Sequence, residues 1–351
     1  MHDPNGYNGA SIPPGSRSAL GVASRLGVAG LEGVAGRRKG SAGVPMLAEL
    51  FAGKFLVLYA YLASAMWVHW RGRERHKFTR QLTDHSTFLA PINCFMYAFS
   101  AVPNRPILNA HDFPELGVLR ENWTLLREEA LRLSDQGSIK ASEKYDDLGF
   151  NSFFRRGWKR FYLKWYGDPL PSARALCPRA VQLLEQIPSV KAAMFAMLPP
   201  GGELVAHRDP YAGSVRYHLG LVTPNDERCR IYIDGMPYHW RDGEDIVFDE
   251  TYIHRAKNET NVNRIILFCD VERPMRFRWA RAVNRFLARH LVQASATRNI
   301  EGEQVGALNK LFSLVYPIRV KLKALKRRNR RLYYAQKYLV LGGLLALLFL
   351  V

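Results

Sequence analysis

The stretch GGELVAHRDPYAGSVRYHLGLVTPND, residues 201–226, decides how the fold of this chain is interpreted. It places short runs of residues that favour strands between turn signals such as TPND at 223–226. The same pattern begins near residue 190 and continues through runs such as RIYI, DIVF and NRIILF. Many short strands at close spacing are typical of a barrel or a double-sheet jelly roll. Neither GxGxxG nor GxxxxGK[ST] occurs, which disfavours a Rossmann domain and a P-loop.

Two histidines and one aspartate in this region form a candidate metal site. His207 and Asp209 stand as an HxD pair at one strand end, where residues i and i+2 point to the same side. His254 follows 47 residues later, in DETYIHRAKN. Two imidazoles and one carboxylate can occupy one face of an octahedral Fe(II) ion and leave three positions for a co-substrate and O₂. The alternatives are a zinc hydrolase, in which the ion activates water, and histidines with structural roles only.

Arg264 supplies a further argument for iron. It lies ten residues after His254, on the expected strand NRIILF. A guanidinium remains charged and binds a carboxylate through two parallel hydrogen bonds. We therefore expect Arg264 to hold a 2-oxoacid co-substrate beside the metal. In a zinc hydrolase, Arg264 would have no evident role.

The segment 201–226 and MPYHWRDGEDIVFDETYIHRAKNETNVNRIILFCDVERP, residues 236–274, resemble the aspartyl/asparaginyl β-hydroxylase family of Fe(II)- and 2-oxoglutarate-dependent oxygenases. The resemblance covers about residues 150–275 and rests on the RYHLGL stretch and on the spacing DE(x)₃H(x)₉R. It implies a mainly β catalytic domain with the double-stranded β-helix (jelly roll) fold. It also implies an oxidoreductase, a dioxygenase that uses Fe(II), 2-oxoglutarate and O₂.

The resemblance assigns roles by motif match. His207 and His254 match metal ligands, and Arg264 matches the residue that binds the distal carboxylate of 2-oxoglutarate. Arg216 and His218 of RYHLGL match positions at the co-substrate pocket, although alternate strand residues also face inward for structural reasons.

Asp209 is a departure from part of the family. The animal peptide hydroxylases have a glycine in this place, whereas this chain carries an aspartate. A complete metal-binding triad of His207, Asp209 and His254 is therefore expected.

Positive charge gathers toward the two ends of the chain. The formal net charge is 50 − 31 = +19, and residues 319–331 hold eight basic residues without an acidic one. Residues 71–80 hold five basic residues and one acidic residue. A core that binds nucleic acid is therefore not indicated. Each basic run lies beside an apolar stretch, so we predict membrane-spanning helices over 47–70 and 332–351, with the domain between them in the cytoplasm.

These patterns predict a division of the chain into six parts. Residues 88–103, an apolar stretch within the third part, are either an interfacial or re-entrant segment or part of the soluble core. The parts are 1–46, disordered or not translated; 47–70, a transmembrane helix; 71–149, a juxtamembrane helical region; 150–275, the oxygenase domain; 276–331, a basic amphipathic helical region; and 332–351, a C-terminal transmembrane helix.

The stretch QLTDHSTFLAPINCFMYAFSAVPN, residues 81–104, and the two apolar ends are similar to the bacterial lipid A 2-hydroxylase branch of the family. This resemblance implies lipid A modification, the hydroxylation of a secondary acyl chain at C2 in a lipopolysaccharide precursor. The site would be the cytoplasmic side of the bacterial inner membrane. The alternative is β-hydroxylation of an aspartyl or asparaginyl residue in a protein, which would use the same iron and co-substrate residues.

Overall fold

The computed structural model of the chain describes residues 53–142 and 147–350. The predicted disordered segment 1–46 and the first six residues of the predicted span 47–70 lie outside these residues.

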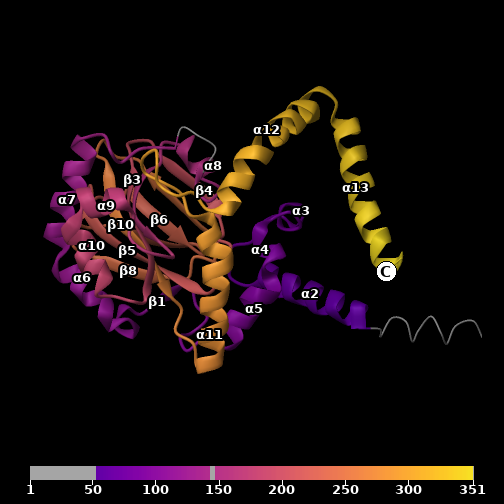
Figure 1. Cartoon of the computed structure of the whole chain (residues 1–351), viewed down its shortest axis with the longest axis horizontal. Helices are drawn as coiled ribbons and strands as arrows, with labels where there is room; N and C mark the ends of the chain where they lie inside the picture. Colours follow the sequence, from indigo (N-terminus) through magenta and orange to yellow (C-terminus); the bar gives the residue numbers. More distant parts are fainter. Residues whose placement is uncertain (1–52, 143–146, 351) are drawn as a thin grey trace, which may run out of the picture. The chain divides into compact units, whose positions relative to one another are not determined.

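Two antiparallel sheets form the body of the protein (Figure 1). The larger sheet has the strand order β1 (Ile107–Leu108), β8 (Asp245–Phe248), β5 (Ser214–Val222), β10 (Arg264–Glu272), β3 (Val190–Leu198) and β2 (Lys159–Trp165). The smaller sheet has the order β4 (Glu203–His207), β9 (His254–Asn258), β6 (Cys229–Ile233) and β7 (Met236–His239).

The chain crosses repeatedly from one sheet to the other between β3 and β10. Strands β3, β5, β8 and β10 belong to the larger sheet, whereas β4, β6, β7 and β9 belong to the smaller one. This winding is that of a double-stranded β-helix. The prediction of a mainly β jelly-roll domain with flanking helices is confirmed.

Strand β3 shows why the larger sheet is apolar on both faces. Met194 and Ala196 pack in the layer between the sheets, with Phe268 and residues of the smaller sheet. Phe195 and Met197 point the other way, into a layer that the sheet shares with helices. Side chains alternate between the two faces of a strand, so a strand covered on both sides is apolar at nearly every position.

Helices flank the sheets and follow them toward the C-terminus (Figure 1). The α-helices are α2 (Gly53–Trp70), α3 (Phe78–Gln81), α4 (His85–Phe88), α5 (Ala90–Ala98), α6 (Gly117–Glu121), α7 (Trp123–Asp135), α8 (Asn151–Phe154), α9 (Pro171–Leu176), α10 (Pro178–Glu185), α11 (Arg278–Leu287), α12 (Ala307–Arg328) and α13 (Arg330–Leu350). Single turns of other helix types are η1 (Ala110–Asp112), η2 (Pro114–Leu116), η3 (Ala288–Val292) and η4 (Gln293–Ser295).

The apolar stretch 88–103 contains α5, which packs against the rest of the protein. Met96 and Tyr97 are buried in a small cluster that also contains Tyr211 and Met275. One face of this helix is therefore part of a hydrophobic core.

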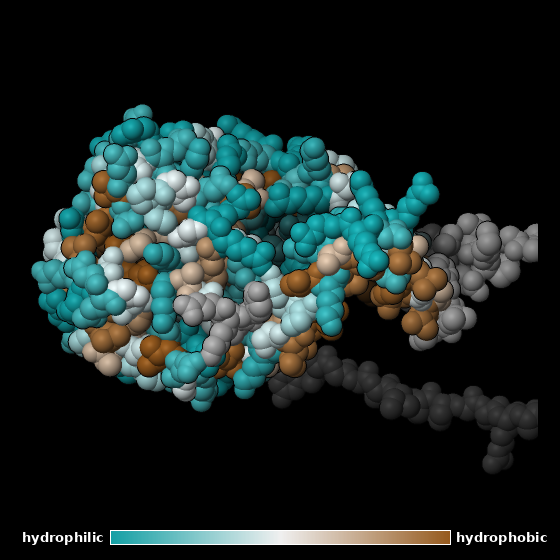
Figure 2. All heavy atoms as spheres, turned by 90° about the horizontal axis from the view of Figure 1, so that it is seen from above, coloured by the Kyte–Doolittle hydropathy of each residue, from teal (hydrophilic) through white to brown (hydrophobic). Residues whose placement is uncertain are grey.

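The two predicted membrane spans require a correction. Both segments are helical where described, as α2 and α13, but none of the helices in 53–142 and 147–350 is long and apolar enough to cross a membrane. Polar residues lie within both predicted spans: Lys54 and His69 in α2, and Gln336 and Lys337 in α13. Figure 2 shows one face of the molecule, largely hydrophilic over the body, with hydrophobic residues gathered toward the right, on the side where α13 lies in Figure 1.

Gly220, within the RYHLGL stretch on β5, offers a test of the packing. Its carbonyl accepts a hydrogen bond from the Gly243 amide at 2.9 Å, and a Cβ added at position 220 would overlap the backbone oxygen of Arg241. We expect Gly220→Ala to lower the free energy of unfolding by about 2 kcal/mol or more, because backbone blocks the added methyl group. Gly149→Ala, with open space around it, is the control. Equal stability of the two variants in urea would contradict this packing.

Candidate metal centre

An irregularity in the pairing of β4 with β9 sets the direction of His207. Leu204 pairs with Ala256 and His207 with His254, and the register shifts between these two pairs. Leu204 and His207 line the same cavity although they are three residues apart. Strict alternation would place them on opposite faces, so the shift is what turns the imidazole inward.

His254 needs no such irregularity. It is the first residue of β9, and its neighbours two and four positions on, Ala256 and Asn258, are buried like it. The pairing with β4 brings the two imidazole rings to a centroid separation of 4.1 Å. Ligand atoms of His207, Asp209 and His254 all lie within 4.8 Å of one another. The structure therefore brings together the three residues that the sequence selected as metal ligands.

Backbone carbonyls fix the tautomer of both histidines. Nδ1 of His207 lies 2.7 Å from the carbonyl oxygen of Val205, and Nδ1 of His254 lies 3.0 Å from that of Tyr252. A carbonyl only accepts, so each Nδ1 carries the proton and each Nε2 keeps a free lone pair. Burial and the neighbouring His254 lower the pKa of His207 to about 3. Both imidazoles are thus prepared as neutral ligands for a metal.

Asp209 is held ionised by Arg216 on β5. Nη2 of Arg216 donates to Oδ2 of Asp209 at 2.7 Å, while Oδ1 lies 3.5 Å from Nε2 of His207. Burial by itself would raise the pKa of this carboxyl group, but Arg216 and the two imidazoles outweigh burial and lower the pKa to about 2. The carboxylate oxygen that faces the histidines is therefore available to a cation.

The guanidinium of Arg216 is already engaged by protein carboxylates. Besides Asp209, it donates from Nε to Asp270 at 2.9 Å, and Glu250 lies 3.7 Å away. Arg216 lines the cavity, as the sequence predicts. These contacts make it a residue that positions Asp209, rather than a free binding group for a co-substrate.

Arg264 is buried without an acidic partner. It begins β10, its exposed fraction is 1%, and its guanidinium lies 4.4 Å from the ring centroid of Trp240. Its Nε has no hydrogen-bond partner, and no carboxylate forms an ion pair with it among the residues that the structure describes. Burial lowers its pKa to about 10. An anion entering this cavity would supply the missing charge.

Other unpartnered polar atoms line the same cavity. Both ring nitrogens of His218 and Nε1 of Trp240 are buried without a hydrogen bond within the described chain. The His218 ring packs 5.0 Å from that of Phe248 and 5.4 Å from that of Phe268, measured between centroids. Buried donors are normally satisfied, so this group of orphaned atoms indicates a polar guest. Trp240 did not emerge from the sequence, where it is one tryptophan in a turn-rich segment.

The residues present fit Fe(II) together with a small dicarboxylic acid. The triad supplies nitrogen and oxygen ligands on one side, and the arginine and the other unpartnered donors supply a polar wall. The cavity measures about 30 Å³. It has room for an ion and about one water, so a five-carbon diacid enters only if neighbouring side chains move. Phe153, whose ring centroid lies 4.6 Å from that of His207, is one of the side chains that line the cavity.

Comparisons with known proteins agree with this site. Residues 120–274 match the family model described as aspartyl/asparaginyl beta-hydroxylase. The ornithine lipid ester-linked acyl 2-hydroxylase of Rhizobium tropici is 31% identical over 181 residues, which cover 51% of this chain and 64% of that protein. The human aspartyl/asparaginyl beta-hydroxylase is 28% identical over 161 residues, which cover 44% of this chain and 21% of that protein.

A crystal structure of a Pseudomonas putida prolyl-4-hydroxylase aligns with 44% of this chain and 87% of that chain, at 19% identity and a TM-score of 0.29. This structural similarity is distant. The chain spans less than two thirds of the length of both curated relatives.

Loss of one imidazole tests the metal centre directly. We expect His254→Gln to weaken binding of Co(II), a stand-in for Fe(II), at least about 100-fold, because even the outer partners of metal ligands affect affinity 10- to 100-fold. Visible absorption during anaerobic titration measures this binding. His111→Gln changes an exposed histidine that does not line the cavity and serves as the control. Wild-type affinity in His254→Gln would show that the triad does not bind the metal.

Proposed function

We propose that residues 120–274, which match the family model described as aspartyl/asparaginyl beta-hydroxylase, form a domain of that family and that the protein is an Fe(II)- and 2-oxoglutarate-dependent hydroxylase. The observation that carries the proposal is the shared cavity. One wall holds the His–Asp–His cluster, and the same cavity contains the buried, unpaired Arg264. A hydrolytic metal site would leave that cation without a counter-charge.

Each side chain has a defined task in this reaction. His207 and His254 hold the metal through Nε2, and Arg216 keeps Asp209 ionised and oriented. Arg264 binds the distal carboxylate of 2-oxoglutarate. The bound iron supplies O₂ activation, in which 2-oxoglutarate, O₂ and a C–H bond give succinate, CO₂ and an alcohol. The aromatic walls around the cavity exclude water from it.

We propose that the substrate is a membrane lipid, hydroxylated at C2 of an ester-linked acyl chain. The 2-hydroxylase of ornithine lipid named above supports this substrate class, since it is the relative that matches the larger share of this chain. Lipid A is the acyl lipid that the resemblance of residues 81–104 to the lipid A 2-hydroxylase branch implies. Hydroxylation of an aspartyl or asparaginyl side chain is the second candidate, and the human relative supports it.

We further propose that the protein works at the cytoplasmic face of the bacterial inner membrane. Support comes from aromatic and basic residues that occur together at the start of α11. Phe277 and Trp279 are about half exposed and stack on each other, and Arg278 and Arg281 lie beside them in the sequence. Aromatic rings with arginines favour the interface of a membrane that carries anionic lipids.

Product analysis distinguishes the substrates. Purified protein with Fe(II), 2-oxoglutarate and O₂ is incubated in parallel with lipid A, ornithine lipid or an Asp/Asn-containing peptide. We expect one added oxygen atom in an acyl chain of a lipid, with one succinate formed per product. His207→Ala should lower this rate at least about 100-fold, and His111→Gln should leave it unchanged.

Mass spectrometry of the extracted lipids and peptides reads the result. Oxygen added to the peptide and to neither lipid would contradict the lipid proposal. Lipid hydroxylation that persists without ferrous iron or without 2-oxoglutarate would contradict the proposed reaction itself.

A further inference from the structure

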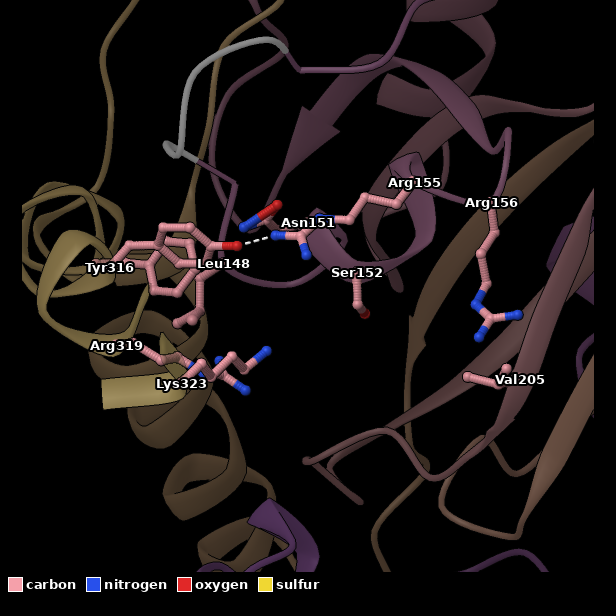
Figure 3. Close-up of a pocket in the computed structure, with 10 residues that line it drawn as sticks. Leu148, Asn151, Ser152, Arg155, Arg156, Val205, Tyr316, Arg319 and Lys323 are labelled. Carbon is pink, nitrogen blue, oxygen red and sulfur yellow. Dashed lines mark hydrogen bonds between the residues drawn. The ribbon is translucent and has the colours of Figure 1, made fainter. Parts of the chain in front are cut away.

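A second, larger pocket adjoins the metal centre. It measures about 620 Å³ and lies between α8, β4 and α12 (Figure 3). Val205 lines it, two residues before the ligand His207. In α8, Asn151 and Ser152 line this pocket, whereas Phe153 lines the metal cavity. The single turn of α8 and the end of β4 therefore separate the two spaces.

Four of the ten residues that line this pocket are basic. Arg319 and Lys323 extend from α12 toward the α8 side, and Arg156 lies on the opposite wall with Val205 (Figure 3). Arg156 is paired with Glu203, and Arg155 donates a hydrogen bond to the hydroxyl of Tyr316.

Three of these cations form no ion pair with an acidic side chain among the described residues. They are Arg155, Arg319 and Lys323. Arg319 is the main cause of a lowered pKa at Lys323, with smaller contributions from burial and Arg155. Like charges thus converge on this space, as they do in a site for an anion.

Part of the lining is apolar. Leu148, Val205 and Phe312 contribute hydrocarbon surface, and the first two are about two-fifths exposed. A pocket with a cationic side and an apolar side matches an amphiphile. An inorganic anion would use only the cationic side.

We infer that this pocket binds the anionic headgroup, a phosphate or carboxylate, of the acyl lipid that the neighbouring centre hydroxylates. The inference rests on the proposed function and names its substrate class more closely. C2 of an ester-linked chain is the first carbon after the ester carbonyl, so its headgroup must be held close to the iron. Val205 and His207 are separated by two residues of strand, about 7 Å, which is the scale required.

The test uses two charge-reversal variants of α12 with equal change in net charge. Arg319→Glu/Lys323→Glu reverses two pocket residues, whereas Lys310→Glu/Lys321→Glu reverses two exposed residues of the same helix that do not line the pocket. The probes are dihexanoyl phosphatidic acid, a short-chain lipid that stays monomeric, and inorganic phosphate. Calorimetric titration of the full chain measures the affinity for each of the two probes. Circular dichroism confirms that both variants remain folded.

We expect the pocket variant to bind the phosphatidic acid at least 10-fold more weakly than the wild type, and the control variant to remain within 2-fold. We also expect the wild type to bind inorganic phosphate at least 10-fold more weakly than the lipid. Equal weakening in both variants would overturn the site, because the effect would then be that of general charge. Equal affinity for phosphate and lipid would overturn the assignment of a lipid headgroup.

Turnover separates this inference from the proposed function. The pocket variant should keep wild-type affinity for Co(II) and 2-oxoglutarate, while its KM for the lipid rises at least 10-fold and its kcat changes less. An unchanged KM would overturn the headgroup site. If the wild type hydroxylates no lipid, the proposed function fails, and the titration still decides whether the pocket binds an anionic lipid.

Discussion

A buried guanidinium without a carboxylate is the constraint on which this account depends. Removing an unpaired charge from water destabilises a fold by several kcal/mol. Arg264 nevertheless lies at the start of β10 with only 1% of its surface exposed and with Trp240 as its neighbour. In the same cavity, nitrogen atoms of His218 and Trp240 are also buried without a hydrogen-bond partner among the described residues. A fold retains such an arrangement where a ligand supplies the missing acceptor, and a dicarboxylic acid bound beside a metal supplies it here.

The two-sheet winding places the metal ligands next to this arginine. His207 ends β4 and His254 begins β9, and the register of these two strands makes them direct partners. A slip of one residue would turn the His207 side chain to the opposite face. Arg216 on the larger sheet then reaches across to Asp209. The site is therefore built where the smaller sheet meets the larger one, from strands distant in sequence.

Sequence patterns predicted the parts of this site that depend on local spacing. The HxD pair, His254 and Arg264 were predicted because strand alternation and turn signals are local. The register shift that turns His207 inward was not, since it depends on pairing with β9. The hydrogen bond from Arg216 to Asp270 could not be predicted from local spacing either, because the two residues are 54 positions apart in the sequence. The two predicted membrane spans have no counterpart in the described residues 53–142 and 147–350, where no helix is long and apolar enough to cross a membrane.

The most direct test is anaerobic titration of the Fe(II)-loaded protein with 2-oxoglutarate and with 2-oxobutyrate, which lacks the distal carboxylate. The visible absorption of the iron–oxoacid chelate follows binding. We expect the wild type to bind 2-oxoglutarate at least about 10-fold more tightly than 2-oxobutyrate. Arg264→Gln should bind both equally, because the charge-assisted contact is lost. The same preference in Arg264→Gln as in the wild type would contradict the account.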